Sequence, residues 1–152
     1  MRAVIQRTTG ASVEVEQNIV GEIERGLVVF LGIEEGDTTA DLQYICDKVV
    51  GIRVFDDENE IPNLSVQDIG GSILLISQFT LCADARKGKR PSYIKAAPSE
   101  QAIPAHEAVS DCENFRRAYL CNAAFSRQIC RCVLSTTARI RYCWIRRSCF
   151  NL

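Results

Sequence analysis

The spacing of apolar and polar residues predicts a series of short strands at the start of the chain. Apolar residues and β-formers alternate loosely over residues 2–7 and clearly over residues 11–15, and residues 19–23 form a short apolar partner. Residues 27–33 are almost continuously apolar, which is typical of a central strand buried on both faces. We therefore expect four strands before the first helix.

Two helices and two further strands are expected in the next part of the chain. Capping residues at 37–41 precede an apolar stripe at i, i+3, i+4 and i+7, made by Leu42, Ile45, Cys46 and Val49. Strands are expected at residues 52–55 and, most strongly, at residues 72–81. A second helix is expected from Ala97 to about Glu113, interrupted or restarted at Pro104.

These elements predict a single α/β domain with a mixed or antiparallel sheet, or a barrel, and two main helices. The hairpin-like spacing of the early strands argues against a doubly wound sheet. No apolar run is long enough to span a membrane, and the N-terminal residues lack the apolar core of a signal peptide. We therefore expect a cytoplasmic protein without a membrane partner.

Composition changes abruptly at about residue 114. All 19 acidic residues precede this point, whereas residues 114–152 contain eight Arg, five of the eight Cys, and no Lys, Gly or Pro. Such a shift marks a tail, a linker or a segment of different origin. We therefore divide the chain into a domain over residues 1–113 and an aberrant Arg/Cys-rich tail over residues 114–152.

The residue types alone indicate neither a metal site nor a catalytic triad. His106 is the single histidine, and we expect it to be solvated because it lies in a polar helical stretch beside Glu107. No His, Cys or Asp cluster has the spacing of metal ligands. Reduced thiols are expected for the cysteines because the chain shows no signal peptide.

A motif after the strongest strand points to a family. Residues 77–81 read Ser-Gln-Phe-Thr-Leu, and they are followed by Ala83-Asp84 and by Lys-Gly-Lys-Arg-Pro-Ser over residues 87–92. This order resembles the D-aminoacyl-tRNA deacylases, also called D-tyrosyl-tRNA(Tyr) deacylases. The start of the chain, residues 1–7, and Asn-Leu-Ser at 63–65 resemble the same family. The resemblance continues to about Glu113.

The resemblance implies hydrolysis of the ester bond in D-aminoacyl-tRNA, which releases the D-amino acid and tRNA and serves translation quality control. It also implies a homodimer and no metal or organic cofactor. The catalytic residues would be Ser77, Gln78, Phe79 and Thr80. The residues that bind tRNA would be Arg7, Lys87, Gly88, Lys89, Arg90 and Pro91.

Physical reasoning gives these residues specific roles. Backbone N–H groups at a strand end can hold an ester carbonyl as it becomes an oxyanion. We expect Phe79 to stack or pack against the terminal adenine, although it could be an ordinary core residue of the strand. Thr80 lacks a visible base, so we prefer a positioning role, with the 2′-hydroxyl of the substrate assisting. The loop 86–90 would neutralise phosphates, or else be a solvated charged loop.

The tail departs from the family. The resemblance predicts Asn-x-Gly-Pro-x-Thr near the C-terminus, with a cis Gly-Pro that enters the partner's pocket and rejects L-amino acids, but residues 114–152 contain no Gly or Pro. Codons permitted for residues 134–139, read from each third base, can encode Val-Asn-Asp-Gly-Pro. We therefore hypothesise a one-base frameshift near residues 114–117.

Other interpretations of the tail are an RNA-binding segment or a zinc site. The alternative function is an inactive relic, or a tRNA-binding protein that lacks the Gly-Pro half of the site. A tail in which arginines are interleaved with apolar residues cannot easily bury the faces that the native final strands would bury. We therefore expect a poorly ordered or misplaced tail, exposed core edges and weakened dimerisation.

Overall fold

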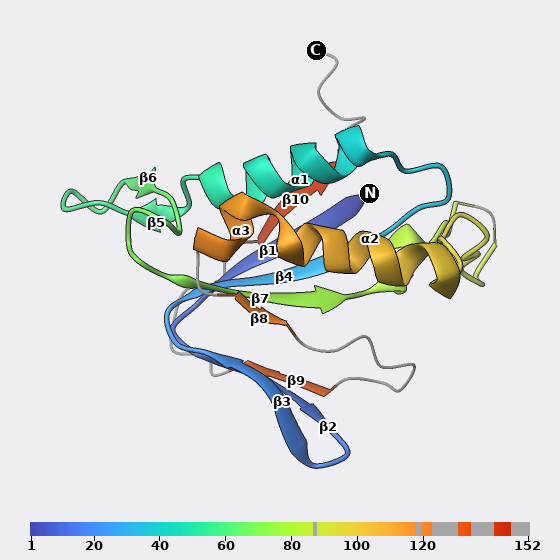
Figure 1. The fold of residues 1–152 in the computed structure, drawn as a ribbon, viewed down its shortest axis with the longest axis horizontal. Helices are drawn as coiled ribbons and strands as arrows, with labels where there is room; N and C mark the ends of the chain where they lie inside the picture. The colour runs from blue at the N-terminus through green and yellow to red at the C-terminus, as the bar shows by residue number, and fades with distance from the viewer. Residues whose placement is uncertain (87, 118–119, 123–130, 135–141, 147–152) are drawn as a thin grey trace.

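The structure is a computed structural model that describes residues 1–86, 88–117, 120–122, 131–134 and 142–146. Its strands form a five-stranded, a three-stranded and a two-stranded sheet (Figure 1). Within these residues, no helix is long and apolar enough to cross a membrane.

The five-stranded sheet is mixed. Its central strands are β1 (Arg2–Thr8), β4 (Gly26–Gly32) and β7 (Ser72–Ser77), with β10 (Tyr142–Arg146) beside β1 and β8 (Leu120–Asn122) beside β7. Strand β4 pairs antiparallel with β1 and parallel with β7. The expected mixed sheet is therefore confirmed.

Three helices cover one face of this sheet: α1 (Thr39–Gly51), α2 (Ser99–Asp111) and the short α3 (Glu113–Arg117) (Figure 1). Helix α1 begins as the capping residues predict, because the Thr38 amide donates a hydrogen bond of 2.9 Å to the Asp41 carboxylate. Helix α2 runs on through Pro104, although an interruption was expected. Pro104 is exposed, so its ring meets water, and the helix loses only one backbone hydrogen bond.

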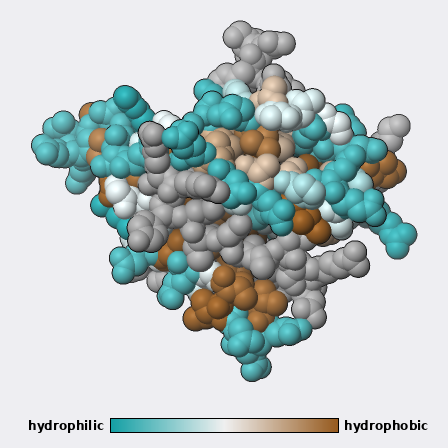
Figure 2. All heavy atoms as spheres, viewed as in Figure 1, coloured by the Kyte–Doolittle hydropathy of each residue, from teal (hydrophilic) through white to brown (hydrophobic). Residues whose placement is uncertain are grey.

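Alternation along β4 and β7 places apolar side chains in two separate cores. One core lies under the helices and contains Leu27, Val29, Leu31, Ile45 and Val49. The other contains Val28, Leu74 and Ile76 together with Ala11, Val13 and Ile23 from the hairpin of β2 (Ala11–Val15) and β3 (Asn18–Ile23). Figure 2 shows hydrophobic residues gathered on the surface in the region of the β2–β3 hairpin. Burial on both faces explains the continuous apolar runs of β4 and β7.

Two expected strands are shorter than their apolar runs. The strand expected at residues 72–81 ends at Ser77, and the chain then forms a 3₁₀ helix, η1 (Phe79–Cys82). The partner strand β4 ends at Gly32, so no ladder is left to extend. The strand expected at residues 52–55 is reduced to β5 (Phe55–Asp56), which pairs with β6 (Pro62–Leu64).

Three segments of the tail pair with strands of residues 1–113. The sequence analysis expected the sheet edges of residues 1–113 to be exposed. Strand β10 pairs with β1, β8 pairs with β7, and β9 (Arg131–Leu134) pairs with β2. Ladder hydrogen bonds join backbone groups, so an unusual side-chain sequence does not prevent them.

Candidate active site

The four residues with predicted catalytic roles lie together where β7 ends. Ser77 pairs with Leu31, and the Gln78 amide donates a last hydrogen bond of 2.7 Å to the Leu31 carbonyl. The chain then turns, with the Leu81 amide bonded to the Gln78 carbonyl at 3.2 Å. We call residues 77–82 the Ser77–Cys82 turn. It places short polar side chains and Phe79 at one end of the five-stranded sheet.

This turn packs against the end of β4, where a glycine makes room for it. A Cβ added at Gly32 would lie 3.0 Å from the Leu81 Cβ and from the Cys82 Sγ, and 3.1 Å from the Gln78 carbonyl oxygen. The buried Cys82 thiol donates to the Ile33 carbonyl at 3.4 Å. Burial is the main cause that raises the pKa of Cys82, so it stays a thiol with a structural contact.

Gln78 and Thr80 contact one another within the turn. The Gln78 Nε2 group donates a hydrogen bond to the Thr80 Oγ1 atom. An amide cannot take up the hydroxyl proton, so this contact orients Thr80 and does not activate it as a nucleophile. Among the described residues, no carboxylate or imidazole hydrogen-bonds to Thr80.

Phe79 points outward and has an aromatic neighbour. Its side chain is 58% exposed, so it is not the core strand residue that was one of the two sequence interpretations. Tyr93 is 40% exposed and meets Phe79 edge to face, with ring centroids 5.4 Å apart. Sequence reasoning missed Tyr93. The signal available was an aromatic residue in an otherwise polar, basic loop.

The basic loop folds back beside this aromatic pair. Asp84 and Ser92 exchange backbone hydrogen bonds of 2.8 and 2.9 Å, which close the loop next to the turn. Arg86 pairs with Asp84, and this contact holds the pKa of that carboxyl well below its usual range. Gly88, Lys89, Arg90 and Pro91 are exposed, as is the paired Arg86. Lys87 lies outside the described residues.

Arg7 is not brought to this cluster. It pairs with Leu27 near the opposite end of β4, five positions away from Gly32 in the strand. Its Nη1 group donates to the Val54 carbonyl at 2.6 Å and lies 3.1 Å from the Asp56 carboxylate. These contacts join β1 to the β5 segment, so Arg7 has a structural role in this chain.

His106 is buried, not solvated as the sequence analysis expected. It lies on the inner face of α2 with Ala102, Val109 and Ser110, and only 3% of its surface is exposed. Desolvation lowers the pKa of His106. The polar neighbours that suggested exposure, such as Glu107, lie on the outer face of the same helix.

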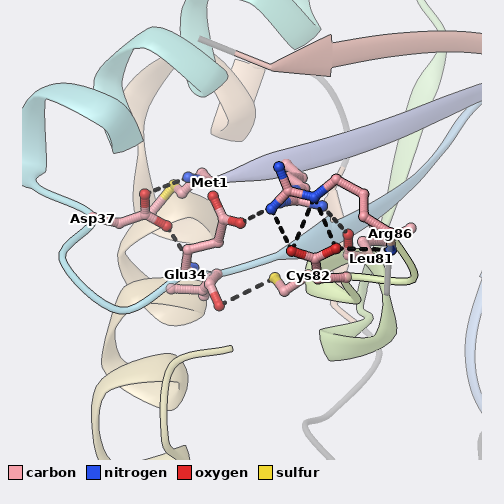
Figure 3. Close-up of polar contacts among 9 residues, drawn as sticks. Met1, Glu34, Asp37, Leu81, Cys82 and Arg86 are labelled. Atoms are coloured by element: carbon pink, nitrogen blue, oxygen red, sulfur yellow. Dashed lines mark hydrogen bonds and ion pairs between the residues drawn. The ribbon is translucent and has the colours of Figure 1, made fainter. Parts of the chain in front are cut away.

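Charged groups that sequence reasoning did not single out hold the N-terminus near the turn (Figure 3). The Met1 ammonium pairs with Asp37. Arg2 pairs with Glu34 at 2.6 Å, and its other terminal nitrogen donates to the Leu81 carbonyl at 2.8 Å. The available signals were the resemblance of residues 1–7 to the family and the place of Asp37 among the capping residues before α1.

A cavity of about 480 Å³ lies elsewhere, beside α1 and the α2–α3 junction. Its lining residues are Leu42, Gln43, Ala108, Asp111, Cys112, Glu113 and Asn114. None of them belongs to the turn. In the described part of the chain, no three His, Cys, Asp or Glu side chains are arranged to hold a metal ion.

Comparison with known proteins assigns the family. The family model described as D-Tyr-tRNA(Tyr) deacylase matches residues 4–127, which include the whole Ser77–Cys82 turn. The chain belongs to this family. A D-aminoacyl-tRNA deacylase of Thermosipho africanus is 50% identical over 116 residues, or 76% of this chain and 78% of that protein. One of Desulfitobacterium hafniense is 56% identical over 102 residues, or 67% of this chain and 68% of that protein.

The fold of this chain matches solved structures over most of its length. A protein described as c-Myc DNA Unwinding Element Binding Protein matches with a TM-score of 0.83 and 32% identity, over 94% of this chain and 97% of that one. A probable eukaryotic D-amino acid tRNA deacylase matches with a TM-score of 0.75 over 95% of this chain. Its identity of 12% makes it a match of fold alone.

Proposed function

We propose that this deacylase hydrolyses the ester bond that joins a D-amino acid to the 3′ end of tRNA. The carrying observation is the Ser77–Cys82 turn, which gathers Gln78, Phe79 and Thr80 at one exposed end of the sheet in a chain of this family. Water adds to the ester carbonyl, the bond to the ribose oxygen breaks, and that oxygen takes up a proton. The products are a free D-amino acid and tRNA.

The proposed chemistry is positioning, because an aminoacyl ester is already activated. The amide N–H groups of Phe79 and Thr80 have no backbone acceptor within the described residues, so they are available to the developing oxyanion. Gln78 orients the Thr80 hydroxyl, which we assign to substrate positioning. The neighbouring 2′-hydroxyl of the ribose assists the attack.

The RNA end of the substrate is assigned to the outer surface of the turn. Phe79 presents an exposed ring on which the terminal adenine can stack. Lys89 and Arg90 lie exposed in the adjoining loop and would neutralise phosphates, while Arg86 is already paired with Asp84.

The second half of the site that the resemblance implies is missing from this sequence. The resemblance implies a homodimer in which a cis Gly-Pro from the partner rejects L-amino acids, and residues 114–152 contain neither residue type. This absence is the one observation that favours a second candidate function. In that case the chain is an inactive relic that still binds tRNA through the basic loop.

A deacylation assay separates these functions. We expect the chain to release D-Tyr from D-Tyr-tRNA, and Phe79→Ala to raise KM about 5- to 150-fold because stacking contributes about 1–3 kcal/mol per base. Ile19→Ala is the matched control, since Ile19 is a 63% exposed apolar residue on the β2–β3 hairpin. Gln78→Ala should lower kcat. Absence of turnover with retained tRNA binding would establish the relic and refute the enzyme.

A further inference from the structure

Three side chains and the N-terminus form a connected polar network between β1 and the Ser77–Cys82 turn (Figure 3). Asp37 accepts from the Met1 ammonium, and its other oxygen accepts from the Glu34 amide at 2.7 Å. Glu34 pairs with the Arg2 Nη2 group at 2.6 Å. The Arg2 Nη1 group donates to the Leu81 carbonyl at 2.8 Å. The network therefore ends on the backbone of the turn.

Low exposure leaves this network less screened by salt and water than an ordinary surface ion pair. The Arg2 and Glu34 side chains are 12% and 18% exposed, and the Asp37 side chain is 12% exposed. Charges that are this shielded from water are screened less than surface charges. A planar guanidinium can also meet two acceptors in fixed directions at once, which a lysine ammonium does less well. Arg2 makes a directed hydrogen bond only to Leu81; its contact with Glu34 is a close ion pair, in which the Glu34 Oε1 atom has no hydrogen-bond partner in the described part of the chain.

Arg2 donates to the Leu81 carbonyl, which has no hydrogen-bond donor within η1 itself. The last carbonyls of a helix have no N–H donor within it, and Leu81 is the penultimate residue of η1. At its start the turn is held by the Gln78 amide on Leu31, and at its end by the Cys82 thiol on Ile33. The Arg2 contact is the one charge-assisted bond among these three.

We propose that Arg2 is a positioning residue, which acts through Leu81 to hold the Ser77–Cys82 turn where its amides and Thr80 meet the ester. Its catalytic consequence rests on the proposed deacylase function. A displacement of about 1 Å in a positioned group can cost on the order of 100-fold in rate. The remaining two contacts of the turn keep it folded without Arg2, but in a broader range of positions.

Hydrogen exchange tests the contact without any assay of activity. In Arg2→Gln, carried on a chain with a free Met1 ammonium, we expect the Leu81 and Ala83 amides to exchange at least about 10-fold faster. The β4 amides of residues 27–30 should keep their rates. Arg25→Gln is the matched control, because Arg25 lies over the Phe55 ring near the opposite end of the sheet. Unchanged turn amides, or an equal rise throughout β4 and the turn, would overturn the proposal.

Kinetics and chemical rescue then test the consequence for catalysis. Arg2→Gln should lower kcat about 10- to 100-fold and change KM less than about twofold, because the turn moves while the RNA-binding surface stays. Added ethylguanidinium should restore part of kcat in Arg2→Gln, whereas equimolar ethylammonium should not. A change in KM alone, or equal rescue by both cations, would contradict the assignment. An inactive parent chain would refute the proposed function, and the exchange test would still decide the Arg2 contact.

Discussion

A single residue, Gly32, decides how closely the Ser77–Cys82 turn approaches the sheet. Gly32 is the last residue of β4, and the turn occupies the space where its side chain would stand. Sequence patterns mark Gly32 only as a position inside the apolar run of residues 27–33. Its importance comes from Leu81 and Cys82, which approach it from a distant part of the chain.

A methyl group at Gly32 should therefore displace the turn. We expect Gly32→Ala to cost about 1–3 kcal/mol in free energy of unfolding, because the added Cβ crowds two side chains and a carbonyl. Deacylation should fall by a larger factor than in the control Gly51→Ala. Gly51 ends α1 with open space around it, so its substitution should leave stability unchanged or raise it by up to about 1 kcal/mol. Urea unfolding and deacylation rates measure both effects, and equal results for the two variants would contradict the steric argument.

The end of strand β7 and the buried face of helix α2 are both decided by the elements that they pack against. Strand β7 stops at Ser77 because β4 offers no further ladder, although the apolar run continues to Leu81. Helix α2 buries His106 because its inner face packs toward the core shared with α1 and α3. The predicted element type is confirmed for α2 and for residues 72–77, but residues 79–81 form a 3₁₀ helix where a strand was predicted. Packing decided where the strand ends and which residues of the helix are buried.

Burial of His106 on α2 predicts a specific pH dependence. Its folded pKa is lowered from 6.5, so between these two pKa values the unfolded chain binds a proton that the folded chain does not. Stability should be level above about pH 6.5 and fall as the pH drops from there through the folded pKa. The slope from this group cannot exceed about 1.4 kcal/mol per pH unit.

Urea unfolding between pH 8 and pH 5 measures this slope, and His106→Gln should remove the part that begins near pH 6.5. Because His106 is the only histidine, its imidazole C–H signals in an NMR titration give the folded pKa directly. A folded pKa at or above 6.5 would show that desolvation does not dominate at this position.

At the scale of the whole molecule, strand pairing extends further along the chain than the sequence similarity to the aligned deacylases. The Thermosipho africanus deacylase aligns over 76% of the chain, while the solved structure at 32% identity covers 94%. Composition changes at about residue 114, yet β8, β9 and β10 still pair with β7, β2 and β1. Backbone pairing alone does not restore a Gly-Pro segment, since residues 114–152 contain neither residue.

The division at residue 114 predicts what the gene contains. If a one-base shift near residues 114–117 replaced the segment, the nucleotides that encode residues 134–139 will read Gly-Pro in another frame. A chain rebuilt in that frame should dimerise in sedimentation experiments and discriminate D-Tyr-tRNA from L-Tyr-tRNA better than the present chain. Nucleotides without Gly-Pro in any frame there would refute the frameshift, and the Arg/Cys-rich segment would then be the native one.

The sequence by itself determined β1 to β4 and α1 closely, because their burial follows periods of two and 3.6 residues that any local window contains. It also located the Ser77–Leu81 motif, through resemblance. Only the tertiary structure decided that β4 and β7 run parallel, that Arg7 stays at the far end of the sheet, and that Arg2 reaches Leu81. Arg2 and Leu81 are 79 positions apart, and contacts over such separations depend on packing of the complete sheet, which no local pattern encodes.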